Sequence, residues 1–192
     1  MRVQTTKINN RRYLGNKYKL LPFITKIITE NCGDFDSFTD IFAGTGTVAS
    51  AYTDKKITTN DILFSNYISN TAWFSPENFD RDKLISFITI YNSLDIIEEN
   101  YMTKNFSDTY FSRDVCSKIG FIREDIEEKK NAKIINNREY AILLTSSLFI
   151  VGASSLDSIL KHLFSGFRFF SAANIRISKT WSDKSTFFLH AS

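Results

Sequence analysis

Apolar and polar residues follow a helical period near the start of the chain. Between residues 19 and 31 the apolar side chains recur at intervals that place them on one face of a helix. These residues are Leu20, Ile24, Ile27 and Ile28. Pro22 suits the first turn of this helix, and Gly33 stands where the helix would end.

Beyond this helix the pattern changes from helical to extended and back. The apolar run at 36–42 predicts a strand that ends in a turn containing Gly44 and Gly46. Residues 46–55 then predict a short helix, and residues 56–61 predict a second strand. This order of elements begins a βαβ unit, which implies a parallel sheet.

Longer helical patterns fill much of the remaining chain. Further helices are expected at 62–74, 80–100 and 137–163. Asn136 or Asn137 would cap the last of them, because a short amide side chain can accept from the first free backbone N–H groups. Residues 101–136 have a mixed pattern that predicts no single element.

Composition places the chain among ordinary globular proteins, and charge adds one local feature. The 192 residues are 43% hydrophobic and 23% charged, which fits one domain. The net charge of +3 is too small to indicate nucleic-acid binding by itself. Residues 164–192 nevertheless hold four basic side chains against one acidic side chain, Asp183. The excess of positive charge therefore lies at the C-terminal end.

Neither cysteine pattern nor hydropathy indicates a special environment. Cys32 and Cys116 belong to no C-x-x-C motif, so neither a metal site nor a disulfide framework is predicted. The N-terminus lacks the apolar core of a signal peptide, and the longest apolar run, at 141–153, is too short to span a bilayer. We expect a cytoplasmic protein without membrane contact.

The chemistry centres on the glycine turn and the acid that follows the second strand. Glycines let the backbone turn sharply and let a ligand approach closely, although a single G-x-G is often only a tight turn. Asp61 ends the second strand, where a carboxylate can accept hydrogen bonds from ribose hydroxyls. The dinucleotide fingerprint G-x-G-x-x-G is incomplete, because Ala49 stands at its last position. A nucleoside with a short charged tail, such as S-adenosylmethionine, fits better than a pyrophosphate.

Three stretches in order carry a resemblance to a known family. "RRYLGNKYKLL" at 11–21, "DIFAGTG" at 40–46 and "NDI" at 60–62 resemble the adenine-specific DNA methyltransferases of the Dam and FokI-like class. The resemblance continues to about residue 160. It implies a Rossmann-like α/β fold of the S-adenosylmethionine-dependent methyltransferases, with an incomplete parallel sheet and flanking helices. Residues 1–163 would then be the cofactor-binding part, and 164–192 an unmatched basic and aromatic tail.

The resemblance also implies a set of cofactor-binding residues. They are Tyr13, Gly15, Lys17, Asp40, Gly44, Gly46, Asp61 and Ile62. Tyr13 would line the site with its ring, Lys17 would meet the methionine carboxylate, Asp40 the ammonium group, and Ile62 the adenine. A solvated Lys17, and an Asp40 that accepts only from backbone N–H groups, are the structural alternatives. Phe42 is expected in the core.

One part of the family pattern is missing. Members of this family hold a flipped adenine with an Asp-Pro-Pro-Tyr motif, and this sequence contains no Pro-Pro pair. We therefore predict no catalytic residue here and expect a truncated methyltransferase that is inactive alone. Double-stranded DNA is the expected partner, and a second polypeptide carrying the missing half is a possible one.

Other interpretations remain open at this point. The chain could be a non-catalytic fragment that binds cofactor or DNA and complements a partner, or an NAD-dependent oxidoreductase. The tail at 164–192 could be an altered end of a truncated reading frame or a basic and aromatic surface for DNA. His162 and His190 have no nucleophile or paired acid at a recognisable spacing, so both are interpreted as incidental.

Overall fold

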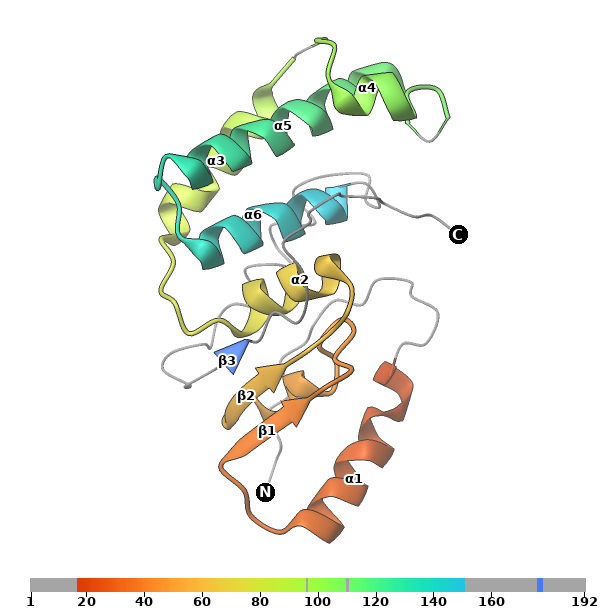
Figure 1. Ribbon diagram of the computed structural model, residues 1–192, viewed down its shortest axis with the longest axis vertical. Coiled ribbons are helices and arrows are strands. Elements are labelled where there is room, and N and C mark those ends of the chain that lie inside the picture. The colour runs from red at the N-terminus through yellow and green to blue at the C-terminus, as the bar shows by residue number, and fades with distance from the viewer. Residues whose placement is uncertain (1–16, 96, 110, 151–175, 178–192) are drawn as a thin grey trace.

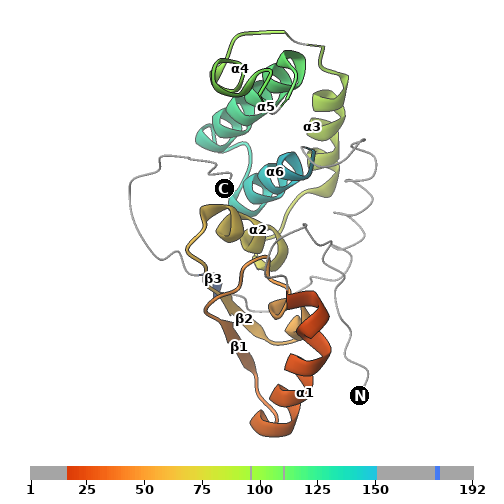
Figure 2. The same cartoon turned by 90° about the vertical axis from the view of Figure 1, so that its right-hand side faces the viewer.

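The computed structural model describes residues 17–95, 97–109, 111–150 and 176–177 of the chain. It is a mixed α/β structure in which helices cover a small parallel sheet. Helix α1 (Leu21–Cys32) lies on one side of the sheet and α2 (Phe64–Phe74) on the other (Figure 1). Helix α6 (Asn137–Ile150) packs on α2, and the remaining helices lie beyond α6 (Figures 1 and 2).

The sheet has the predicted parallel arrangement. Strand β1 (Ser37–Asp40) pairs in parallel with β2 (Lys56–Thr59), with Asp40 opposite Thr59. A two-residue strand, β3 (Arg176–Ile177), pairs in parallel with the other edge of β2. The order is therefore β1-β2-β3. The carboxyl ends of β1 and β2 meet at the same edge, which is where the glycine turn begins.

A small apolar cluster joins α1 to the sheet. The 3₁₀ turn η1 (Lys17–Leu20) leads into α1, and Pro22 lies in its first turn as predicted. Leu21 packs with three residues of the segment after the glycine turn, namely Val48, Ala51 and Tyr52. The rings of Phe38 on β1 and Tyr52 stack with centroids 4.4 Å apart. This cluster fixes η1, and with it Lys17, beside the end of β1.

The larger core lies on the opposite side of the sheet. It contains Ile57 of β2 and apolar side chains of α2, α3 (Arg81–Ser93), α5 (Arg113–Asn131) and α6. Its largest fully buried side chains include Phe74, Leu84, Ile126 and Ile142. Helix α2 is therefore held between the sheet and α6, and its sheet-facing side chains have little freedom to move.

Several predicted boundaries are wrong. Strand 36–42 ends at Asp40, because the Phe42 amide turns back to donate to Asp40 Oδ1 at 3.2 Å. The helix expected at 46–55 is only the 3₁₀ segment η2 (Ala49–Tyr52). The helix at 80–100 ends at Ser93.

The unassigned region contains two helices. They are α4 (Tyr101–Phe106) and α5. Asn100 caps α4 and also donates to the Ser117 carbonyl of α5 at 2.8 Å. A Cβ at Gly120 would lie 2.2 Å from Asn100 Oδ1, so glycine is needed for this close approach. Charged side chains of α5 make contacts with two tyrosines and with one another: Asp125 accepts from the Tyr91 hydroxyl, Glu127 from the Tyr140 hydroxyl and from Arg123.

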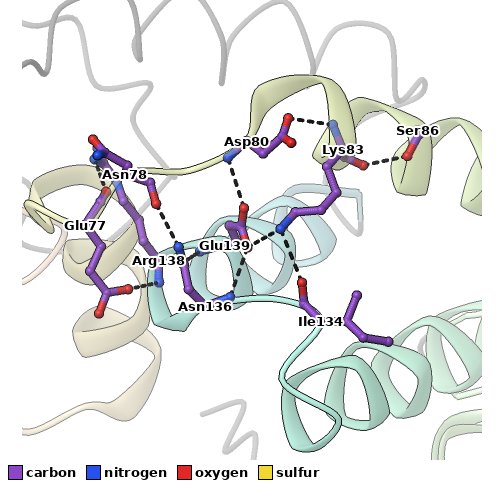
Figure 3. Close-up of polar contacts among 9 residues, drawn as sticks. All are labelled: Glu77, Asn78, Asp80, Lys83, Ser86, Ile134, Asn136, Arg138 and Glu139. Atoms are coloured by element: carbon purple, nitrogen blue, oxygen red, sulfur yellow. Dashed lines mark hydrogen bonds and ion pairs between the residues drawn. The ribbon is translucent and has the colours of Figure 1, made fainter.

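A buried polar network fixes the start of α6 (Figure 3). Asn136 caps the helix as predicted. Its side-chain Oδ1 accepts from the Glu139 backbone N–H, and its backbone N–H donates to Glu139 Oε2, both at 2.9 Å. Glu139 also accepts from the Asp80 amide at 2.9 Å and from Lys83 Nζ at 2.7 Å. Arg138 donates to the Glu77 carbonyl at 2.8 Å. The network ties α6 to the end of α2 and the start of α3. The expected continuation of α6 to residue 163 lies outside the described residues.

Within the described part of the chain, no helix combines the length and apolar character needed to cross a membrane.

Candidate functional site at the carboxyl ends of β1 and β2

The backbone of the glycine turn is held at both strand ends. After β1, the Ala43 amide donates to the Asn60 carbonyl at 3.0 Å, and Asn60 Nδ2 donates to the Ile41 carbonyl at 3.1 Å. The Gly46 amide then closes a tight turn by donating to the Ala43 carbonyl at 2.8 Å. The turn is therefore an ordered loop that crosses from the end of β1 towards the end of β2.

Both glycines of the turn have backbone angles that other residues rarely adopt. Gly44 has a φ of +53° and Gly46 a φ of +79°. A Cβ at Gly44 would meet nothing within 4 Å, so the space above this residue is open. A Cβ at Gly46 would lie 2.5 Å from Asn70 Oδ1 and 2.6 Å from Phe74 Cε2. Gly44 thus leaves room for a ligand, and Gly46 lets the turn lie directly on α2.

Lys17 and Asp40 are brought together from different elements. Lys17 Nζ donates to the Phe42 carbonyl at 2.7 Å and lies 4.0 Å from Asp40 Oδ1. The Asp40 side chain is only 10% exposed. Its Oδ1 accepts from the Phe42 backbone amide, in line with the alternative in which Asp40 accepts from backbone N–H groups. Its Oδ2, however, is buried without a hydrogen-bond partner among the described residues. Asp40 therefore has one acceptor oxygen that none of the described residues uses.

Asp61 is the most heavily bonded side chain of the site. Its Oδ2 accepts from the Gly44 amide at 2.8 Å. Its Oδ1 accepts from the Leu63 amide and from Asn66 Nδ2, both at 2.9 Å. An ionised carboxylate offers about four acceptor positions, so about one remains on Oδ2. Asp61 therefore joins the glycine turn to the start of α2.

Exposed apolar side chains border these polar groups. Ile62 is 92% exposed and Phe42 is 75% exposed. The prediction that Phe42 belongs to the core is wrong, because β1 ends two residues earlier and the chain turns outward there. Exposed apolar side chains beside an open backbone turn form a surface on which a flat apolar ring could lie.

Sequence reasoning missed Asn66 and Asn70, two buried asparagines of α2. Asn66 donates to Asp61, and Asn70 Nδ2 donates to the Gly44 carbonyl at 3.1 Å. Their four-residue spacing places them on one face of α2. Amide side chains at helical spacing, just after a strand-end acid, are the signal that could have identified them.

Some predicted residues lie outside the described part of the chain. They are Tyr13, Gly15, His162 and His190. The described residues contain no cluster of three or more side chains suited to binding a metal ion. Lys17, Asp40, Gly44, Gly46, Asp61 and Ile62 are all near one edge of the sheet.

Comparison with known proteins gives a consistent result. Residues 13–169 match the family described as D12 class N6 adenine-specific DNA methyltransferase. The chain is 32% identical over 149 residues to the type II methyltransferase M.FokI of Planomicrobium okeanokoites, covering 69% of this chain and 23% of that protein. It is 33% identical over 151 residues to modification methylase StsI of Streptococcus sanguinis, covering 70% and 23%.

A third relative gives similar figures. Modification methylase LlaI of Lactococcus lactis subsp. lactis is 32% identical over 154 residues, which cover 71% of this chain and 24% of that protein. The chain thus spans about a quarter of the length of these relatives. No solved structure shows significant similarity to it.

Proposed function

The chain belongs to the D12 class N6 adenine-specific DNA methyltransferase family, and we propose that its site at the ends of β1 and β2 binds S-adenosylmethionine. The single observation that carries the proposal is the buried Oδ2 of Asp40, which has no hydrogen-bond partner in the described part of the chain and lies beside the open glycine turn. A buried carboxylate oxygen without a partner is costly, and a ligand ammonium group would remove that cost. The cofactor, when bound, supplies an activated methyl group.

The charges near the end of β1 suit the amino-acid end of this cofactor. Asp40 would accept from the ammonium group, while Lys17, whose side chain is 37% exposed, could turn its remaining donors to the carboxylate. Positive φ angles and the open space at Gly44 would let the backbone pass close beneath the ligand. Tyr13 and Gly15 remain proposed members of the site on the strength of the family resemblance.

The groups near the end of β2 suit the adenosine. Asp61 retains about one acceptor position on Oδ2, which could take a ribose hydroxyl. This is fewer than the pair of hydrogen bonds that its place at the strand end suggests. Ile62 and its exposed neighbours would cover the adenine ring. The role of Asp61 would thus combine ligand binding with support of the turn.

The fold proposed for the chain is the Rossmann-like fold of the S-adenosylmethionine-dependent methyltransferases. The parallel order β1-β2-β3, with α1 and α2 on opposite faces, supports it. Residues 1–163 would form the cofactor-binding part and 164–192 a separate segment, although β3 already places residues 176–177 against β2.

The proposed substrate of the complete enzyme is adenine in double-stranded DNA, with restriction–modification as its context. The motif Asp-Pro-Pro-Tyr, which would hold the target base, does not occur in this sequence. We therefore propose that this chain binds the methyl donor but does not transfer the methyl group unless other residues complete the site. The non-catalytic alternative is a fragment that complements a partner polypeptide. Methyl transfer that occurs only after a second polypeptide is added would support it.

Calorimetric titration tests the cofactor proposal. We expect S-adenosylmethionine to bind with one molecule per chain and NAD⁺ to give no measurable binding. Matched binding of both, or binding of NAD⁺ alone, would favour the oxidoreductase interpretation. No binding of either compound to the folded chain would contradict the proposed site.

A further inference from the structure

Two buried amides of α2 support the site from below. Asn66 is 5% exposed and Asn70 is 1% exposed, and both lie on the face of α2 that meets the glycine turn. Neither residue is a strong helix former, and a buried amide must lose its hydration. Their presence on this face therefore calls for contacts that offset both costs.

The contacts form a closed circuit of hydrogen bonds. Asn66 Nδ2 donates to Asp61 Oδ1 at 2.9 Å, and the Gly44 amide donates to Asp61 Oδ2 at 2.8 Å. Asn70 Nδ2 then donates to the Gly44 carbonyl at 3.1 Å. The Gly44 carbonyl and Asp61 Oδ1 thus accept directly from side chains of α2, and the Gly44 amide and Asp61 Oδ2 bond to each other. The spacing between turn and acid is set by the distance between two adjacent turns of α2.

Asn70 also sits unusually close to the second glycine. Its Oδ1 would lie 2.5 Å from a Cβ at Gly46, and this oxygen is buried without a partner among the described residues. Leaving such an acceptor unpaired costs about 1–3 kcal/mol. An apolar side chain of the same size would avoid that cost but could not donate to Gly44. The benefit of asparagine here therefore lies in its hold on the turn.

We propose that Asn66 and Asn70 are positioning residues, which fix the glycine turn and Asp61 in the arrangement that binds the methyl donor. The inference rests on the proposed function, because it names the support of that same site. Neither amide contacts the cofactor. Each acts through a group that does, so the site is held in its binding geometry before the cofactor arrives and loses less entropy on binding.

Variants of similar shape separate this role from general stability. The pair Asn66→Leu and Asn70→Leu removes the amide donors and keeps the branched shape of the side chain. Thr71→Val is the matched control, because Thr71 is also buried on α2 and its hydroxyl donates only within the helix, to the Tyr67 carbonyl at 2.9 Å. Asn66→Ser and Asn70→Ser give a second pair of variants if a leucine variant does not fold.

Two measurements are made on each variant. Titration with S-adenosylmethionine should show affinity about tenfold weaker in either asparagine variant, equivalent to about 1.4 kcal/mol, and unchanged affinity in Thr71→Val. In the free proteins, the backbone amide NMR signals of Gly44 and Gly46 should move in the asparagine variants and stay in place in the control. Thermal unfolding records the stability of all three.

A double-mutant cycle tests whether Asn66 acts through Asp61. In the Asp61→Ala background, Asn66→Leu should weaken the affinity for S-adenosylmethionine by less than twofold. A purely structural role would give the same loss of affinity in both backgrounds and would overturn the inference for Asn66.

The outcomes distinguish this inference from the function on which it rests. Wild-type affinity and unmoved glycine signals in both asparagine variants would overturn the positioning role. If the Gly44 and Gly46 signals move in the asparagine variants but the wild-type chain binds no S-adenosylmethionine, the result would show that α2 holds the glycine turn. It would overturn the proposed function instead.

Discussion

At the scale of single residues, Asp61 has two tasks that one substitution removes together. We predict that Asp61→Ala weakens S-adenosylmethionine binding by about 1–3 kcal/mol, because it removes a ligand acceptor and leaves the partly buried Gly44 amide and Asn66 Nδ2 unpaired. Its three protein hydrogen bonds mean that thermal stability should fall as well. Isothermal titration and thermal unfolding measure the two effects.

Asp54→Ala is the matched control for this substitution. The Asp54 side chain is 72% exposed and, in the described part of the chain, forms an ion pair with the neighbouring Lys55. Neither affinity nor stability should change in this variant. Unchanged affinity for S-adenosylmethionine in a folded Asp61→Ala protein would show that Asp61 does not belong to the site.

The two glycines of the turn should respond differently to alanine. Both need a positive φ, so both variants are strained, but only at Gly46 would the new Cβ collide with Asn70 and Phe74. We predict that Gly46→Ala lowers the unfolding free energy by about 1–3 kcal/mol more than Gly44→Ala does. Urea denaturation of both variants checks this. Equal losses would show that the turn does not rest on α2 as described.

Single residues were predicted from the sequence where local chemistry decides their place. The spacing of the glycines and of the strand-end acids is local, and the structure places Asp40, Gly44, Gly46 and Asp61 at one edge of the sheet. Phe42 was misplaced because its apolar side chain resembles a strand residue and nothing in the sequence marks the end of β1. Asn70 was missed because its contact with Gly44 crosses 26 residues.

At the scale of elements, the polar network at the start of α6 should make stability depend on pH. Burial alone would raise the pKa of Glu139, but hydrogen bonds from Lys83 and from the Asp80 and Asn136 amides outweigh burial and hold the pKa below its ordinary value. A carboxyl whose folded pKa is lowered stabilises the fold above its unfolded pKa, about 4.3. That contribution is lost as pH falls through the folded pKa.

We predict that Glu139→Gln lowers the unfolding free energy at pH 7 by about 1–3 kcal/mol, because Lys83 and two amides lose a charged acceptor. The difference from the wild type should shrink as pH falls from the unfolded pKa, about 4.3, through the lower folded pKa of Glu139. Denaturant titrations between pH 7 and pH 3 measure it. Glu30→Gln is the control, since the Lys26–Glu30 pair is exposed on α1 and should contribute little. A difference that stays constant with pH would contradict the account.

Elements were predicted well where their pattern is periodic and their caps are local. Helix α1, with Pro22 in its first turn, and α6, with Asn136 as its cap, begin close to the expected residues. The strand pairing followed from the βαβ order. Helix α5 was not predicted, because charged residues such as Asp125 and Glu127 interrupt its apolar pattern; in the structure they accept from the hydroxyls of Tyr91 and of the partly buried Tyr140. Contacts of this kind depend on helices that meet only in the folded chain.

At the scale of the whole molecule, the helices of the described residues pack around a small sheet whose one edge carries the candidate site. Helix α2 lies between the sheet and α6, and α3 and α5 pack on the far side of α6 (Figures 1 and 2). The amides that hold the turn are on α2, which packs against both the sheet and α6. The proposed methyl-donor site is thus supported by a helix of the core, whereas the proposed target-base motif is absent from the sequence.

Equilibrium dialysis with methyl-labelled S-adenosylmethionine and duplex DNA that contains adenine tests the central claim most directly. After incubation, the label bound to protein and the label incorporated into DNA are counted separately. The account predicts label retained with the protein, lost in Asp61→Ala, and none in the DNA above a blank without protein. Orientation of a flipped base supplies several powers of ten in rate, and no described residue is assigned that task. Label in the DNA that disappears in Asp61→Ala, or no label retained by the folded wild-type chain, would contradict it.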